Sequence, residues 1–290
     1  MMLHSLNHVA GVHDVDKLSY FSMGSCDMRF ALAGGQRVEA YARGKGMCPV
    51  CNGEVIAKCG THRVSHWAHR GMRDCDTWAE KEETEWHRRW KNHFPAECQE
   101  FIQHDGQSGE KHIADVRTPQ GLVIEFQHSH LEPKERDARE RFYGNMVWVV
   151  DGTRLQRDYP RFDREKGALR PTKIQGCFLL ASPDKCFPAM WLDSSVPVIF
   201  DFRGVDENQP PDAFRDSLWC LLPGRAGGSA WVVGMLRKQF VEVAPSCPQL
   251  PVVQEILALM TEIRAAEALE ARRFTGMPGG RGPRRRYARF

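Results

Sequence analysis

Residues 112–143 have the sequence HIADVRTPQGLVIEFQHSHLEPKERDARERFY, and this stretch decides the fold. It predicts a strand, a tight turn, a second strand and a helix, with a third strand, MVWVVD, at residues 146–151. Pro119-Gln120-Gly121 suits a three-residue hairpin loop, in which proline presets the first turn position and glycine takes the left-handed one. We therefore expect a hairpin whose two strands pair in one defined register.

That register places two carboxylates opposite each other. Asp115 faces Glu125 across the hairpin, and Gln127 points the same way because side chains alternate along a strand. Like charges directly opposite on a sheet are destabilising, with Cβ atoms only ~5 Å apart. A hard divalent cation such as Mg²⁺ would explain the pair, since it is typically held by one or two carboxylates. The alternative is an exposed hairpin face on which the two charges splay apart.

The composition predicts a cytosolic protein with a buried core. The chain has 290 residues, of which 42% are hydrophobic and 10% are aromatic. That length suffices for two domains, or for one enlarged domain with a small accessory module. The sequence contains no apolar run long enough for a membrane span, and its N-terminus lacks the apolar core of a signal peptide.

The positive charge is concentrated at the C-terminus. Residues 271–290 contain seven arginines and no acid, so the net charge of +3 leaves −4 for residues 1–270. Because this tail is also rich in glycine and proline, we expect it to be disordered and to add salt-sensitive affinity for phosphates. The alternative is a tail that only keeps the protein soluble.

Ten cysteines in a cytosolic chain indicate metal binding or free thiols rather than disulfides. Cys48-Pro-Val-Cys51 has the spacing of a zinc knuckle, in which two thiolates bind one ion. Two histidines follow at a spacing that suits a turn or the start of a helix, and Cys59 and Cys75 are rival ligands. A redox pair is the alternative, but no thioredoxin-like pattern surrounds it. The predicted ligands of a structural Zn²⁺ are Cys48, Cys51, His66 and His69.

The segment between the cysteines and the hairpin predicts a helix from about Trp78 to His93, with Trp86 and Trp90 in its core stripe. Glu83 and His87 are one turn apart on this helix, so their side chains are neighbours. The alternative is an ordinary pair on the helix surface. Upstream, residues 28–42 predict a second hairpin. Downstream, short strands are expected within CFLLA, PVIFDF, SLWCLL and AWVVGML, followed by a helix over residues 250–274.

Several short motifs follow one another in a characteristic order. They are CPxC, HWAH, E-T-x-W-H-x-x-W-K, I-A-D-V, I-E-F-Q-H-S, R-E-x-F-Y and V-W-V-V-D. From about Met28 to Gly152 this order resembles the CoiA-like competence family, which belongs to the PD-(D/E)xK nuclease superfamily. The resemblance implies an α/β fold with a mixed sheet, in which a restriction-endonuclease-like core follows an N-terminal zinc-ribbon-like module.

The expected organisation of the chain has five segments. They are an N-terminal hairpin region (1–46), the zinc-ribbon-like module (47–77), the nuclease core (78–152), a C-terminal extension of the core (153–270) and the basic tail (271–290).

The resemblance also implies roles for individual residues. Asp115 and Glu125 would bind a catalytic Mg²⁺ or Mn²⁺, and Gln127 would take the place of the superfamily's usual lysine. Glu83 would be a supporting acid with His87 beside it. An amide can orient a water molecule but cannot carry positive charge, so activation of water would depend more heavily on the metal. Independently of the resemblance, we expect His87 or His112 to contact the phosphate or to protonate the leaving oxygen.

The expected function is that of a Mg²⁺-dependent deoxyribonuclease acting in DNA uptake, recombination or defence. The alternative is a DNA-binding or processing factor that keeps the nuclease shape without cleaving, and a nuclease directed at RNA ranks last. The expected partner is DNA, with no membrane association. A second copy of the chain and other DNA-processing proteins are further candidate partners.

Overall fold

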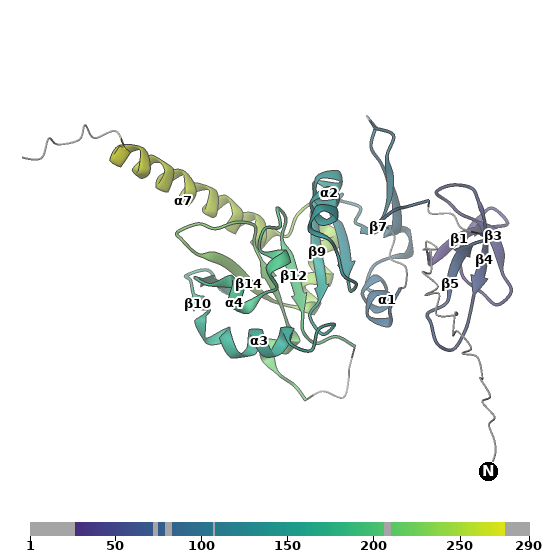
Figure 1. Ribbon diagram of the computed structural model, residues 1–290, viewed down its shortest axis with the longest axis horizontal. Helices are drawn as coiled ribbons and strands as arrows, with labels where there is room; N and C mark the ends of the chain where they lie inside the picture. Colours follow the sequence, from purple (N-terminus) through teal and green to yellow (C-terminus); the bar gives the residue numbers. More distant parts are fainter. Residues whose placement is uncertain (1–26, 72–74, 79–82, 107, 206–209, 276–290) are drawn as a thin grey trace, which may run out of the picture.

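A computed structural model of the protein describes residues 27–71, 75–78, 83–106, 108–205 and 210–275. These residues form two sheets, a small one near the N-terminus and a large one that takes up most of the chain (Figure 1). Both contain antiparallel pairs, and the large sheet also contains parallel pairs. The prediction of a mixed α/β fold is therefore confirmed.

The small sheet has five antiparallel strands in the order β2-β1-β3-β4-β5. Its first two strands form the predicted hairpin, because Gly34 and Gly35 take the positive φ angles that the turn requires. The hairpin and the cysteine segment, which were expected to be separate, share this one sheet. Its strands are β1 (Phe30–Ala33), β2 (Gln36–Glu39), β3 (Lys45–Met47), β4 (Glu54–Lys58) and β5 (His66–His69).

The large sheet has nine strands in the order β10-β11-β14-β13-β12-β9-β8-β7-β6. Strand β9 is parallel to both of its neighbours, β8 and β12, and the other pairs are antiparallel. The strands are β6 (Gln99–His104), β7 (Lys111–Arg117), β8 (Val123–Gln127), β9 (Met146–Asp151), β10 (Arg170–Pro171), β11 (Cys177–Leu180), β12 (Val198–Asp201), β13 (Ser217–Leu221) and β14 (Ala230–Leu236).

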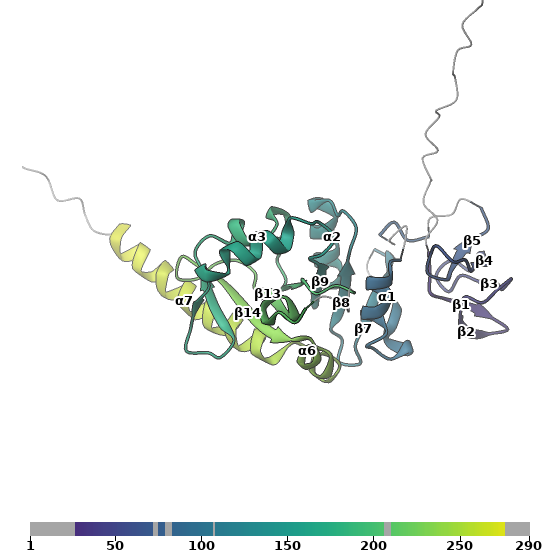
Figure 2. The ribbon, with the colours of Figure 1, turned by 90° about the horizontal axis from the view of Figure 1, so that it is seen from below.

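Helices lie on both faces of the large sheet (Figure 2). The α-helices are α1 (Glu85–Lys91), α2 (Pro133–Tyr143), α3 (Asp158–Glu165), α4 (Pro183–Cys186), α5 (Ala213–Asp216), α6 (Arg237–Val243) and α7 (Pro251–Thr275). Short 3₁₀ turns are η1 (Ala96–Cys98), η2 (Lys166–Ala168), η3 (Ala189–Trp191) and η4 (Ala244–Ser246).

The central hairpin has the predicted register. Val116 pairs with Ile124, Gly121 has φ 86°, and the turn is closed by a hydrogen bond from its N–H to the Thr118 carbonyl. The predicted helix after the hairpin is α2, which has proline in its first turn, and the strand β9 has the predicted bounds. The elements α1-β6-β7-β8-α2-β9 thus follow one another in an α-β-β-β-α-β order.

The helix α1 is shorter than the predicted helix from Trp78 to His93. Thr84 is its N-cap, since its side chain accepts a hydrogen bond from the His87 N–H at 3.3 Å. The first N–H groups of a helix have no carbonyl partner within the helix, and the threonine oxygen accepts from one of them. It therefore favours a helix that starts here rather than upstream. Glu83 therefore lies just before the helix, and Trp78 packs elsewhere.

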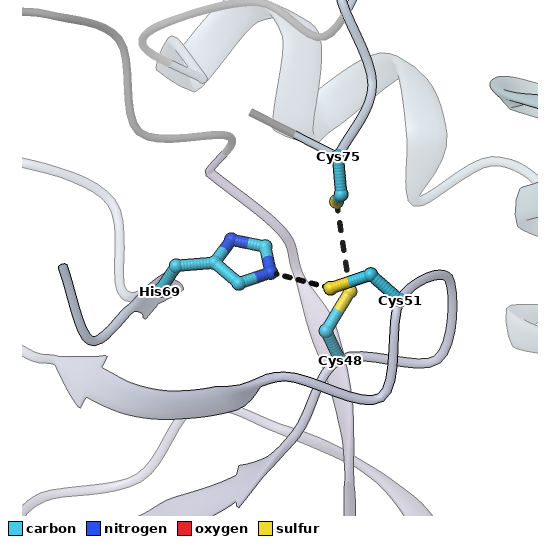
Figure 3. Close-up of side chains that lie close together, drawn as sticks. All are labelled: Cys48, Cys51, His69 and Cys75. Atoms are coloured by element: carbon cyan, nitrogen blue, oxygen red, sulfur yellow. Dashed lines mark hydrogen bonds between the residues drawn. The ribbon is translucent and has the colours of Figure 1, made fainter. Parts of the chain in front are cut away.

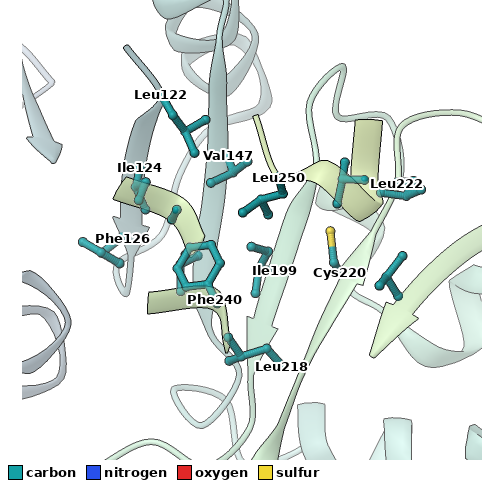
Figure 4. Packing of buried hydrophobic residues seen from close by; sticks show 14 of the residues in the cluster. Leu122, Ile124, Phe126, Val147, Ile199, Leu218, Cys220, Leu222, Phe240 and Leu250 are labelled. Carbon is teal, nitrogen blue, oxygen red and sulfur yellow. The ribbon is translucent and has the colours of Figure 1, made fainter. Parts of the chain in front are cut away.

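Two apolar clusters hold the helices against the large sheet. On one face, Phe126 of β8 packs against Trp86 and Trp90 of α1, with Trp90 stacked on it at 5.6 Å between ring centroids. The same cluster extends to Phe240 of α6 (Figure 4). On the other face, α2, α3 and α4 cover a second cluster that includes Trp148. Strand β8 is consequently buried on both sides, and it carries Glu125 into the interior.

The helix α7 packs along its first half, where Val253, Ile256 and Met260 are buried. Residues 265–272 are exposed, and this part of α7 projects from the rest of the structure (Figure 1). The helix continues to Thr275, so it includes the first residues of the predicted tail. The remaining tail and Cys26 lie outside the described residues. In the described part of the chain, no helix combines the length and apolarity needed to cross a lipid bilayer.

Candidate functional site

Four metal-ligating side chains meet beside the small sheet (Figure 3). Their ligand atoms all lie within 4.8 Å of one another. Cys48 Sγ is 3.7 Å from Cys75 Sγ, and Cys51 Sγ is 3.2 Å from His69 Nε2. Two sulfurs bound tetrahedrally to one Zn²⁺ at 2.3 Å would be about 3.8 Å apart. The four side chains therefore have the chemistry and the spacing to bind zinc.

Local structure places these ligands. Cys48 and Cys51 flank a tight turn in which Asn52 has a φ of 54° and donates its N–H to the Cys48 carbonyl. The Val50 N–H points to Cys48 Sγ at 3.4 Å, as is common in zinc knuckles. The zinc-knuckle interpretation of this pair is thus supported by the geometry of the turn.

The structure corrects one of the four predicted ligands. His66 and His69 both lie on β5, a strand rather than a helix, so a separation of three residues puts them on opposite faces. His66 instead contacts the Val64 carbonyl through Nδ1 at 2.8 Å and lies 3.5 Å from Asp27. Cys75 completes the set in its place, and the other rival, Cys59, is exposed.

The two hairpin carboxylates converge where the ladder between β7 and β8 opens. Beyond the pair formed by Val116 and Ile124, backbone N–H groups donate to carboxylates of the opposite strand instead of to its carbonyls. The Asp115 N–H donates to Glu125 Oε1 at 3.2 Å, and the Phe126 N–H donates to Asp115 Oδ2 at 2.9 Å. The two acids therefore share one face of the sheet, as predicted.

Basic side chains surround this pair. His87 Nε2 lies 2.8 Å from Asp115 Oδ1, and Arg139 Nη1 of α2 donates to Glu125 Oε2 at 3.0 Å. Burial and then the charge of Asp115 raise the pKa of Glu125 to about 8. Burial opposes ionisation of Asp115 as well, but its pKa is lowered because His87 favours the charged form. One carboxylate is thus the stronger acid and the other the weaker.

A second ion-pair group adjoins the first. Lys91 of α1 is buried, with its Nζ 2.8 Å from Glu83 Oε1 and 3.1 Å from Glu100 Oε1. Arg88 also holds Glu83, through its Nε at 2.9 Å. Although burial alone would raise the pKa of Glu83, Lys91 and Arg88 lower it to about 2. Glu83 is therefore an ionised carboxylate held by two cations.

These residues line one small polar cavity of about 50 Å³. Five carboxyl groups and three basic side chains line it, and Phe126 and Met28 are among its apolar walls. The charged and titratable residues that the sequence had singled out in this lining are Glu83, His87, Asp115 and Glu125, and the structure adds Asp27, Lys91, Glu100 and Arg139.

Two other predicted residues lie differently. Gln127 is buried on the same strand as Glu125, and its amide nitrogen donates to Ser129 at 3.1 Å to the carbonyl and 3.0 Å to the hydroxyl. His112 is held between Asp76 and Glu110 at 2.7 and 2.8 Å, and it is not among the residues that line the cavity. A phosphate contact by His112 is therefore not supported by this geometry.

Sequence reasoning missed Arg139 as a partner of Glu125. The sequence did not distinguish Arg139 from the other basic residues of its helix, yet its side chain is only 8% exposed. The signal was present, because Glu135 lies four residues earlier and binds the same guanidinium at 2.6 Å. That local pair did not reveal the contact with β8, which depends on how α2 packs.

The small sheet and its Cys₃His cluster form a β-module with a possible metal site at the N-terminal side of a mixed-sheet domain. Residues 36–77, which include all four ligands, match the family model of the N-terminal domain of competence protein CoiA. The match confirms the resemblance to CoiA-like competence proteins over this segment. Searches of curated proteins and of solved structures found no match.

Proposed function

We propose that the protein is a divalent-metal-dependent DNA nuclease with a competence-related role, and that Asp115 and Glu125 form its catalytic centre. The observation that supports this most is the convergence of two carboxylates from neighbouring strands in a polar cavity where the β-ladder opens. The name of the matched family supplies the link to competence. The α-β-β-β-α-β order favours a restriction-endonuclease-like core.

The donor set fits a hard cation. A carboxylate has about four lone-pair sites, and the hydrogen bonds and ion pairs described above use one direction at each oxygen of Asp115 and Glu125. Mg²⁺ or Mn²⁺ would be held by these two carboxylates, with Glu83 nearby. When bound, such an ion lowers the pKa of a coordinated water and neutralises charge on a phosphate.

The protein's own residues supply the rest. His87 holds Asp115 in its charged form and, when protonated, can give a proton to the leaving oxygen. Lys91 keeps Glu83 ionised within the same cavity. Gln127 is bound to Ser129 and is not among the residues that line the cavity, so its amide would have to turn toward the cavity to orient the attacking water.

A second candidate is a DNA-binding factor that does not cleave. One observation favours it: Arg139 and His87 already bind the two carboxyl groups without a metal. A cation would have to compete with these two side chains for the carboxylates.

The test is cleavage of plasmid and linear DNA with Mg²⁺, Mn²⁺ or EDTA. The nuclease proposal predicts metal-dependent products that EDTA abolishes, and at least a ~100-fold loss of rate in Asp115→Asn and in Glu125→Gln, as is typical when a group that stabilises the transition state is removed. Glu132→Gln is the control, because that side chain is 72% exposed. Full activity in both variants would refute the assignment, and DNA binding without products would favour the second candidate.

A further inference from the structure

A short segment, Cys75 to Trp78, connects the Cys₃His cluster to the carboxylate pair. Cys75 is a ligand of the cluster, and the next residue, Asp76, is buried. Asp76 Oδ2 accepts a hydrogen bond from the Ile113 N–H at 2.7 Å, and Asp76 Oδ1 lies 2.7 Å from His112 Nδ1. Both partners are on β7, within three residues of Asp115. Asp76 thus binds β7, the strand that carries Asp115.

The other end of the segment, Trp78, is linked to Glu125. The Trp78 carbonyl accepts a hydrogen bond from Arg139 Nη2, while Arg139 Nη1 binds Glu125. The Trp78 ring stacks on His112 with 3.3 Å between ring centroids and 11° between planes. The Arg139 guanidinium therefore joins the segment to Glu125. The Trp78 ring also contacts His112, which is bound to Asp76.

A third contact starts at the zinc knuckle itself. The Lys111 ammonium, at the start of β7, donates to the Val50 carbonyl at 2.6 Å. Val50 lies between the two knuckle cysteines, so the knuckle contacts β7 through its backbone. Cys75 is linked to the same strand through the neighbouring Asp76. Ile102 and Ile113 add apolar packing between the large sheet and the core of the small one.

We infer that metal binding at the Cys₃His cluster positions the carboxylate pair, and that Asp76 and Arg139 are the positioning residues that link the two. Binding of a metal fixes the relative positions of its ligands, and such a site is rarely preformed without it. A fixed Cys75 keeps Asp76 on β7 and the Trp78 carbonyl within reach of Arg139. This inference rests on the proposed function only in treating Asp115 and Glu125 as the catalytic pair.

Coupling of this kind is reciprocal, so it can be measured at the zinc end without any nuclease assay. The experiment is the rate of zinc release from zinc-loaded protein to a chromogenic chelator. Arg139→Lys keeps the charge but loses the planar fork that binds Trp78 and Glu125 together. We expect release to be about tenfold faster than in the wild type, within the usual range of coupling between sites. Arg141→Lys, an exposed position on the same helix, is the matched control and should release zinc at the wild-type rate.

Equal release rates in Arg139→Lys and the wild type would overturn the inference. If Arg139→Lys does not fold, hydrogen exchange of the wild type decides instead. Removal of zinc should then speed exchange in residues 111–127 at least tenfold while residues 217–236 keep their protection. Exchange in residues 111–127 that does not respond to zinc, or that rises only together with residues 217–236, would contradict the coupling. A coupled protein that cleaves no DNA would refute the proposed function alone, and a nuclease with uncoupled zinc release would refute this inference alone.

Discussion

The Cys₃His cluster and the carboxylate cavity differ in how their polar side chains are compensated. In the cluster, three sulfurs and an imidazole lie against one another, a combination of ligands typical of zinc. In the cavity, each carboxylate lies against a cationic side chain of the protein. The comparison teaches that the first region offers an ion four ligands and no competing cation among them, whereas in the second an ion would have to compete with Arg139 and His87.

The largest effect expected from this difference is at the cluster. Cys48→Ser should abolish zinc binding and lower the free energy of unfolding of the small sheet by about 5 kcal/mol or more, because at such sites metal binding contributes directly to folding. Metal analysis together with urea denaturation measures both quantities. Cys59→Ser is the control, since Cys59 is exposed and outside the cluster. A zinc-free Cys48→Ser protein of wild-type stability would contradict a structural role for zinc at the cluster.

At the cavity, the next largest effect should come from the buried ammonium. Lys91→Met leaves Glu83 and Glu100 without their shared partner, which should cost about 3–5 kcal/mol of stability. Chemical denaturation of this variant should be compared with Lys134→Met, which changes an exposed lysine of α2. Equal stability of the two variants would show that the cavity does not depend on internal compensation.

The pKa of Glu125 gives a smaller, pH-dependent effect. Its pKa is raised to about 8 in the folded protein from an ordinary value of 4.5. Between these two values the folded state binds more protons than the unfolded state, so stability should fall as the pH rises from about 5 to about 8. Glu125→Gln cannot ionise and should remove this decline. Denaturation curves at several pH values test it, and an unchanged slope in Glu125→Gln would contradict the shift.

The smallest effect separates the two histidines of β5. His66→Gln should retain zinc and lose only about 1 kcal/mol, the usual contribution of one hydrogen bond. His69→Gln should lose zinc, since His69 is in the cluster. Zinc loss in His66→Gln, or its retention in His69→Gln, would favour the ligand set that the sequence alone had predicted.

The elements with local signals were predictable from the sequence. The hairpin register follows from Pro119 and Gly121, and the bounds of α2 follow from Pro133 at its first position. The start of α1 was missed because the charged residues before Thr84 continue a helical pattern, while the cap that ends it is a single hydroxyl.

The candidate sites were predictable only where sequence neighbours meet. The knuckle cysteines and the hairpin acids fall into this class. Cys75 replaces His66 because β5 is a strand, and the spacing of the ligands could not distinguish a strand from a turn. Arg139 reaches Glu125 only through the packing of α2 on the sheet, which local sequence does not encode.

The central claim is that the protein holds a hard cation at the hairpin acids in addition to zinc at the cysteines. The most direct measurement is titration of zinc-loaded protein with Mn²⁺, followed by electron paramagnetic resonance of the free ion. The account predicts one Mn²⁺ bound per chain, lost in Asp115→Asn and retained in Cys59→Ser. Absence of Mn²⁺ binding in the wild type, or equal binding in Asp115→Asn, would contradict it.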